Sequence, residues 1–193
     1  MPAMRGKIAD TKYRVARIDA STGSLMMVSY EHHEAHSGSA YLVTNNAAGG
    51  DGTKSTVTFA TPDTTKWIHV IATARSNVEA LFTVGEAATI SAPSGINYQP
   101  RNKNRNSTKT SGLLPAGSTG LVGNVTTGAT VTSFGTVLEE IHFGSGVKSG
   151  GSERGQNEWV LRQNTTYAFE VQSQAATSEV SIDLHWYEHT DRD

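Results

Sequence analysis

The sequence predicts an all-β protein that folds as a single antiparallel β-sandwich, with a jelly-roll-like strand order as the expected topology. Three features lead to this prediction. Apolar and polar residues alternate with a period of two along most of the chain, and no segment has the 3.6-residue period of an amphipathic helix. The composition, with 36% hydrophobic residues, 18% charged residues and 19 glycines, is typical of short, half-exposed strands joined by many turns.

The clearest strand is 67–74, which is rich in β-branched and aromatic residues. A second run, 78–84, follows after three polar residues, and together the two runs predict a β-hairpin. Within the second run Ala80, Phe82 and Val84 share one face, as expected for an antiparallel sheet with one face on the core. The same reasoning predicts further strands at 25–30, 39–44, 55–60, 88–91, 129–133, 137–143, 158–161, 166–172 and 179–187.

The chain is long enough for one sizeable core, so we expect one main domain, covering 25–193. Residues 1–24 are less periodic, and we expect an N-terminal arm or a peripheral strand that reaches a neighbouring subunit, with a partly disordered terminus as the alternative. Gly, Asn, Ser and Pro are concentrated in three connecting segments, 45–53, 93–109 and 144–156. We therefore expect these segments to be loops.

Composition excludes several classes of function. The formal net charge of −2 at pH 7 disfavours a nucleic-acid partner, which would require a basic face. The chain contains no cysteine, so disulfides, thiolate metal ligands and cysteine catalysis are excluded. The N-terminus lacks the apolar core of a signal peptide, and no apolar run approaches the ~20 residues that span a bilayer. We expect no membrane contact and no cofactor.

One histidine-rich run contains the single candidate metal site. On a strand, His32, Glu34 and His36 would project to one face, and two imidazoles with a carboxylate form a known ligand set. The zincin pattern His-Glu-x-x-His is absent, since the run from His33 to His36 is one residue short. Because Gly38 follows, we expect a strand or turn here and not a helix. The alternative, which we prefer, is a polar strand edge or subunit contact without metal.

Four other histidines are candidates for a pH-sensitive contact. His69, His142 and His185 fall within predicted strands, and His189 lies in the charged C-terminal tail. Histidine titrates near neutrality, so these side chains would form such a contact if the fold brought them together. The sequence alone does not determine whether it does.

Basic residues supply the candidate partner-binding surface. The run 101–109 contains no acidic residue. It could contact an acidic protein surface or a phosphate-bearing surface polymer, or it could be a solvated loop, and we favour a protein partner. A glycine-rich loop carries a further lysine, but its spacing does not fit the phosphate-binding motif Gly-x-x-x-x-Gly-Lys-Ser/Thr. The candidate contact residues are Arg5, Lys7, Arg101, Lys103, Arg105, Lys109 and Lys148.

No catalytic constellation is evident, and we do not expect an enzyme. The Gly-x-Ser-x-Gly pattern of a nucleophile elbow is absent. Glu139 and Glu140 are adjacent, so on a strand they would point to opposite faces and could not act as a glycosidase pair.

Six segments resemble parts of a family of structural proteins from tailed bacteriophages. Their sequences are YEHHEAHSG at 30–38, TPDTTKW at 61–67, NRNSTKT at 104–110, GSGVKSGG at 144–151, EWVLRQNTTY at 158–167 and WYEHTD at 186–191. The resemblance implies a virion component, assembled in the host bacterial cytoplasm, with no enzymatic activity. Within that class we expect a capsid decoration (cement) protein, a homotrimer on the outside of the head that binds the major capsid protein and bridges its subunits.

Two alternatives remain open at this stage. A tail or head-fibre module could bind host-surface polysaccharide through Trp67, Trp159, Trp186 and Tyr187. Jelly-roll folds serve both functions, so the fold class does not separate them. The more distant alternative is a metal-dependent enzyme at the histidine-rich run.

Overall fold

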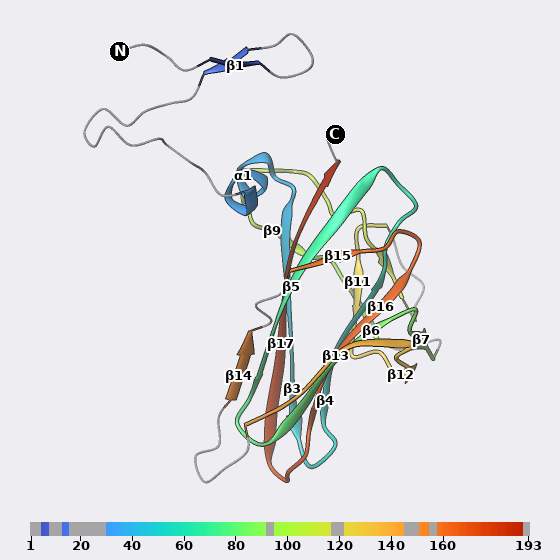
Figure 1. Ribbon diagram of the computed structural model, residues 1–193. Helices are drawn as coiled ribbons and strands as arrows, with labels where there is room; N and C mark the ends of the chain where they lie inside the picture. Colours follow the sequence, from blue (N-terminus) through green and yellow to red (C-terminus); the bar gives the residue numbers. More distant parts are fainter. Residues whose placement is uncertain are drawn as a thin grey trace, which may run out of the picture. The chain divides into compact units, whose positions relative to one another are not determined.

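The structure is a computed structural model that describes residues 5–7, 13–15, 30–91, 95–116, 122–144, 151–154 and 158–190 (Figure 1). The chain divides into two units, residues 1–33 and 34–193, which we describe separately. In the first unit, β1 (Arg5–Lys7) pairs antiparallel with β2 (Tyr13–Val15). The contact of residues 1–24 with a neighbouring subunit remains a prediction, and the predicted domain boundary between residues 24 and 25 lies outside the described residues.

The second unit contains two antiparallel sheets that pack against each other as a β-sandwich (Figure 1). We name the first the β17 sheet, because its central strand β17 (Ser178–Thr190) pairs along most of its length with a neighbour on either side. β14 (Gly151–Arg154) and β15 (Trp159–Leu161) follow one another along the outer edge of β5 (Lys66–Ser76). The order across the sheet is β14 and β15, then β5, β17, β3 (Ala40–Gly49) and β9 (Arg101–Asn102).

The facing sheet is named the β16 sheet after its central strand, β16 (Thr166–Ser173). Its order is β13 (Thr136–Phe143), β6 (Ala80–Glu86), β16, β4 (Lys54–Ala60), β11 (Val125–Thr127) and β8 (Ile96–Tyr98), with β10 (Leu114–Pro115) also beside β4. A separate two-stranded ribbon is formed by β7 (Thr89–Ile90) and β12 (Val131–Ser133). The predicted all-β sandwich is therefore confirmed.

The core lies between the two sheets and is filled by alternate residues of each long strand. Along β5, for example, the buried and less buried positions alternate from Ile68 to Ala74. Phe59 of the β16 sheet stacks on Trp186 of the β17 sheet, with ring centroids 6.5 Å apart, and on Phe169 at 5.7 Å. Burial of such large aromatic side chains is a principal source of stability in a core of this kind.

The predicted hairpin between residues 67–74 and 78–84 is wrong. Both runs are strands, but β5 belongs to the β17 sheet and β6 to the β16 sheet. Both edges of β5 are already occupied, one by β17 and the other by β14 and β15. The polar connection after Ser76 therefore carries the chain across to the facing sheet, a choice that a local turn signal does not specify.

The expectation of a strand or turn in the histidine-rich run is also wrong, because residues Tyr30–Ser37 form helix α1. The helix ends at Gly38, which has φ +75°, in a left-handed conformation that glycine adopts easily. The N–H of Gly38 donates to Ala35 O at 3.2 Å, and the N–H of Ser39 donates to Glu34 O at 2.9 Å. This is the Schellman arrangement for ending a helix. Gly38 thus ends a helix here and does not follow a strand.

The other predicted strands from residue 39 onward are present, with shifted ends. Residues 25–29 of the first predicted strand lie outside the described residues. Several short strands were missed, including β8 and β9 within the predicted loop 93–109 and β14 within 144–156. Strands of two to four residues are too short for a periodic pattern. β9 and β14 form at the edges of the long strands β3 and β5, and β8 pairs with the equally short β11. In the part of the chain that is described, no helix is long and apolar enough to cross a membrane.

Candidate functional site

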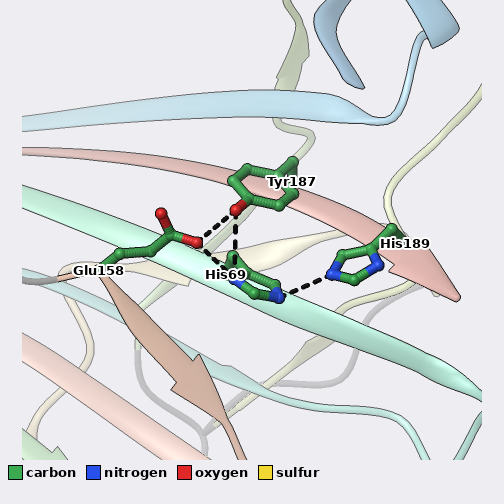
Figure 2. A network of polar contacts seen from close by, with 4 residues as sticks. All are labelled: His69, Glu158, Tyr187 and His189. Carbon is green, nitrogen blue, oxygen red and sulfur yellow. Dashed lines mark hydrogen bonds and ion pairs between the residues drawn. The ribbon is translucent and has the colours of Figure 1, made fainter. Parts of the chain in front are cut away.

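The outer face of the β17 sheet carries four interacting polar side chains, which we call the His69 cluster: His69, Glu158, Tyr187 and His189 (Figure 2). Strand alternation places them there. On β5, Ile68 and Val70 are buried in the core, so His69 projects from the opposite face. On β17, Trp186 is in the core and Tyr187 and His189 project outward. The antiparallel register sets His69 directly opposite Tyr187.

The cluster is held together by hydrogen bonds and ring contacts. The Nδ1 atom of His69 contacts the Glu158 carboxylate, and the hydroxyl of Tyr187 donates to the same Glu158 oxygen, Oε1 (Figure 2). The Tyr187 hydroxyl also lies 3.2 Å from His69 Nδ1. On the other side of the ring, His69 Nε2 lies 2.7 Å from His189 Nε2. The His69 ring stacks on Tyr187, with centroids 4.6 Å apart and planes 13° apart.

The surroundings of the cluster are partly apolar and partly open to solvent. Tyr187 is only 7% exposed, whereas the side chains of His69 and Glu158 are 17% and 38% exposed. Val160 on β15 is opposite His69, and Trp67 on β5 is opposite His189; both are exposed. Solvent protons can therefore reach the imidazoles, while the ring of Tyr187 holds the imidazole of His69 in place.

The chemistry available to this cluster is proton binding. It contains two imidazoles, a carboxylate and a phenol, which are all groups that bind and release protons. The two Nε2 atoms are at hydrogen-bonding distance from each other. Within the described ranges, no group of three or more His, Cys, Asp or Glu residues is arranged to hold a metal ion.

Two of the four histidines proposed for a pH-sensitive contact are thus brought together, His69 and His189. His185 lies on the same outer face of β17 but opposite Ile71, further along the strand. His142 is on β13, in the other sheet. Glu158 and Tyr187 were not predicted to take part in such a contact. Only Tyr187 could have been suggested, by its two-residue spacing from His189 on a predicted strand.

The candidate metal residues do not share one face, because they lie on α1 and not on a strand. Residues i and i+4 of a helix are neighbours, so His32 and His36 are on one side, and residue i+2 is turned about 200° away. Glu34 is buried, and its carboxylate accepts a hydrogen bond from Ser37 Oγ at 3.1 Å. The helix therefore separates the carboxylate from the two imidazoles.

The predicted basic loop lies against the C-terminal end of α1, where carbonyl groups have no partner within the helix. Asn104 Nδ2 donates to His36 O at 2.9 Å, and Lys109 Nζ donates to Ser37 O at 2.9 Å. Asn102 Nδ2 donates to Gly38 O at 2.9 Å. Lys109 thus places its positive charge at the negative end of the helix dipole.

Of the other residues predicted to bind a partner, three lie in the second unit, two lie in the first unit and one lies outside the described residues. Arg101 and Arg105 are exposed, and the backbone N–H of Lys103 donates to Ala40 O at 2.8 Å. Arg5 and Lys7 lie on strand β1 of the first unit. Lys148 lies outside the described residues. The structure therefore brings together the members of the 101–109 run, and their role in partner binding remains a prediction.

A buried carboxylate that sequence reasoning missed holds a loop to the end of β17. Glu188 is 3% exposed and accepts hydrogen bonds from Ser111 Oγ at 2.6 Å, from the Gly112 N–H at 2.9 and 3.0 Å to its two oxygens, and from Trp186 Nε1 at 3.2 Å. The sequence contains no signal for the contact between Ser111 and Glu188, because these residues are 77 positions apart.

The charge of Glu188 also acts on a buried phenol, Tyr41. Burial, with a smaller contribution from the Glu188 charge, raises the pKa of Tyr41 well above its usual value.

A second buried phenol lies at the same end of the sandwich. The Tyr167 hydroxyl donates to Glu86 Oε2 at 2.8 Å and accepts from the Arg162 N–H at 2.9 Å. Burial is the largest cause that raises the pKa of Tyr167 well above its usual value, and the hydrogen bond to Glu86 adds to it. Tyr167 therefore stays protonated at pH values where an exposed tyrosine ionises.

The aromatic residues considered for polysaccharide binding are mostly not available. Trp186 is 2% exposed and belongs to the core, and Tyr187 is buried within the His69 cluster. Trp159 is partly buried and packs against the core. Of the four, Trp67 is the exposed one.

Comparisons of this chain with protein-family models, with curated proteins and with solved structures found no match.

Proposed function

We propose that this chain is a structural protein of a tailed-bacteriophage virion, and specifically a capsid decoration protein that binds the outside of the head and bridges subunits of the major capsid protein. The proposal starts from the resemblance of six segments to that class of protein. A β-sandwich with polar connections suits a protein that acts through its surfaces.

The observation that carries the proposal is the convergence of five of these segments at one end of the sandwich, which we call the α1 end. His36 in the first segment accepts a hydrogen bond from Asn104 in the third. The N–H of Glu188, in the last segment, donates to Ser39 O at 2.9 Å, directly after the first segment. The same strand pairs His189 with Trp67, at the end of the second segment.

The fifth segment joins the same end through the second. The N–H of Thr61 donates to Thr165 O at 2.9 Å, and Gln163 Nε2 donates to Lys66 O at 3.3 Å. The remaining segment begins at Gly144, near Val78 and the connection between β5 and β6; residues 145–150 lie outside the described residues. We infer that the α1 end is the surface that contacts the capsid shell, because segments far apart in sequence meet there.

We also infer a jelly-roll topology. The β17 sheet contains the order β3-β17-β5-β14 and the β16 sheet contains β4-β16-β6-β13. Along the chain, β3, β4, β5 and β6 alternate between the sheets, and β16 and β17 do so again. This order supports an eight-stranded jelly roll, an architecture that viral capsid domains use. A closed homotrimer would suit the three-fold positions of a shell.

Electron cryomicroscopy of particles of the phage that encodes this chain tests the proposal. The expected result is density on the head lattice, with the α1 end against the shell and each copy contacting neighbouring capsid subunits. Density confined to the tail or its fibres, or absence of the chain from purified particles, would contradict the proposal.

Sedimentation of the purified chain with capsids that lack it tests the contact surface. Replacing exposed Arg101 and Arg105 with Gln removes two positive charges from the α1 end. The matched control, Gln174→Glu with Ala176→Glu, changes the net charge equally at exposed positions between β16 and β17, the opposite end. We expect the arginine variant to bind capsids about tenfold more weakly, a loss of about 1.4 kcal/mol of binding free energy, and the control to bind as wild type. Equal binding by both variants would exclude the basic loop from the contact.

The fibre alternative rests on Trp67, exposed beside Val160 on the outer face of the β17 sheet. Titration of host polysaccharide into the purified chain, followed by tryptophan fluorescence, would detect such binding. A saturable change that disappears in Trp67→Ala would favour the fibre role over the decoration role.

A further inference from the structure

The His69 cluster contains a row of three contacts whose two ends are both hydrogen-bond acceptors. At one end, the Glu158 carboxylate faces His69 Nδ1. At the other, the backbone oxygen of Thr190 lies 3.2 Å from His189 Nδ1. An ionised carboxylate and a carbonyl oxygen can only accept. Both Nδ1 atoms must therefore carry a hydrogen for these contacts to be hydrogen bonds.

The middle contact of the row joins the two imidazoles to each other. The 2.7 Å between His69 Nε2 and His189 Nε2 is a hydrogen-bond distance, which requires one hydrogen between the two nitrogens. The three contacts together then hold three hydrogens on two rings. Two neutral imidazoles carry only two ring N–H hydrogens, so the geometry needs one additional proton.

We propose that His69 and His189 form a joint proton-binding site, a dyad that carries one shared proton and a net charge of +1. In the fully bonded form His69 is the imidazolium, which donates from Nδ1 to Glu158 and from Nε2 to His189. His189 is neutral, accepts at Nε2 and donates from Nδ1 to Thr190 O. The dyad fastens the last residues of β17 to β5.

The surroundings favour this singly charged form. Glu158 supplies the opposite charge, and the Tyr187 hydroxyl donates to the carboxylate oxygen that His69 contacts. The face of the Tyr187 ring lies against His69, an arrangement that favours a cation. Val160, from β15, contributes no charge. The other titratable groups on the outer faces of these strands lie further along them: His185 on β17 is opposite Ile71, and Arg75 on β5 pairs with Asp183 on β17. Glu179 lies beyond them at the start of β17, and Lys66 is opposite Thr190 at the other end.

The dyad loses contacts when the pH moves in either direction. A second proton, taken up in acid, would place two N–H groups against each other and raise the charge of the pair to +2. Removal of the shared proton in base leaves two hydrogens for three contacts, so one contact is lost. The attachment of β17 to β5 at this point is therefore strongest at intermediate pH, and two coupled groups of this kind titrate in two separate steps.

A consequence for the α1 end follows from the position of His189 next to Glu188. The Glu188 side chain, on the opposite face of β17, holds Ser111 and Gly112. Loosening the last residues of β17 would weaken that contact as well. The dyad itself does not depend on the proposed virion role, because its titration is a property of the isolated chain.

Nuclear magnetic resonance of the ring nitrogens tests the dyad in the full chain over a pH titration. Near neutrality we expect protons on both nitrogens of His69 and on Nδ1 alone of His189, with two separate titration steps shared by the rings. One protonated nitrogen per ring near neutrality, with a single independent step for each, would overturn the proposal. The wild-type titration decides the question even if a variant fails to fold.

Variants provide the second measurement. In His189→Gln we expect the two-step titration of His69 to become a single step. The same replacement should lower Tm at neutral pH by about 2–4 °C and reduce the further loss of Tm in acid. His142→Gln is the matched control, since His142 is exposed on the other sheet, and it should leave the His69 titration unchanged. An unchanged two-step titration in His189→Gln would contradict a shared proton.

Discussion

Replacing Glu188 with alanine tests the contact that fastens the loop at Ser111 and Gly112 to the end of β17. The carboxylate is 3% exposed and accepts from three groups, at distances between 2.6 and 3.2 Å. Ser111 can rotate its hydroxyl toward another acceptor, but the N–H of Gly112 and the indole N–H of Trp186 are fixed by the backbone and by core packing.

The magnitude follows from the two donors that cannot reorient. A buried donor that loses its partner costs about 1–3 kcal/mol, which gives a loss of about 2–6 kcal/mol for the pair. Removal of a buried charge offsets part of this loss, because the carboxylate no longer has to be desolvated. We therefore expect Glu188→Ala to lower the free energy of unfolding by about 3 kcal/mol, and Tm by about 6–12 °C. Glu188→Gln keeps one acceptor oxygen and should lose about half as much.

Calorimetry and urea unfolding of the purified chain measure these differences. Glu179→Ala is the matched control, because Glu179 is exposed on the same strand and its partner Asn77 contacts its backbone N–H and not its side chain. The control should lie within about 0.5 kcal/mol of wild type. If Glu188→Ala unfolded at the same temperature as Glu179→Ala, the carboxylate would contribute nothing to holding the loop, and our reading of these hydrogen bonds would be wrong.

Two further predictions concern the end of α1 and the buried phenols. Gly38→Ala should lower the free energy of unfolding by about 1–3 kcal/mol, because alanine strains the left-handed backbone and its Cβ would lie 2.3 Å from Ser107 Oγ. The control in the same unfolding assay is Gly50→Ala, whose Cβ would meet no atom within 4 Å. Equal stability of the two variants would contradict the role of Gly38. The raised pKa values of Tyr41 and Tyr167 predict that the native chain binds more protons than the unfolded chain above about pH 10, so the free energy of unfolding falls there by up to about 1.4 kcal/mol per pH unit for each phenol. Tyrosine absorbance during an alkaline titration should show that both phenols ionise only on unfolding. Ionisation of both phenols near pH 10 in the folded chain would contradict burial as the cause of the raised pKa.

The sequence predicts individual strands better than their partners. The alternation along β5, β6 and β17 places the correct residues in the core, because the inside or outside position of a strand residue depends on its neighbours in sequence. The same patterns suggested a hairpin between β5 and β6, which the structure does not have. Each strand can pair at either edge, and the choice depends on which distant strand buries it.

The helix α1 shows a different limit. Its eight residues have no amphipathic pattern, and its C-terminal end is completed by Asn102, Asn104 and Lys109. A short helix is marginal in isolation, since few of its hydrogen bonds lie within the helix itself. The partners that complete it come from a loop more than 60 residues away in sequence, so local propensity could not predict it.

The His69 cluster was also predicted only in part from the sequence. The sequence supplied His69 and His189 as candidates for a titrating contact, together with the strands that carry them. It also supplied the aromatic residues that strand alternation sends either inward, as for Trp186, or outward, as for Tyr187. These properties are local, and reading the chain was sufficient to find them.

Only the tertiary structure decided which of these side chains meet. The register of β5 against β17 sets His69 opposite Tyr187 and within 2.7 Å of His189, and it leaves His142 on the other sheet. Glu158 reaches His69 from a segment 89 residues away in sequence. The sequence by itself determined the β class and the two faces of each long strand, because backbone geometry alternates side chains locally. Strand pairing and the buried contacts were decided by the tertiary structure. Distant strands form hydrogen bonds only in a register that also places the apolar face of every strand in the core and leaves no buried backbone group without a partner.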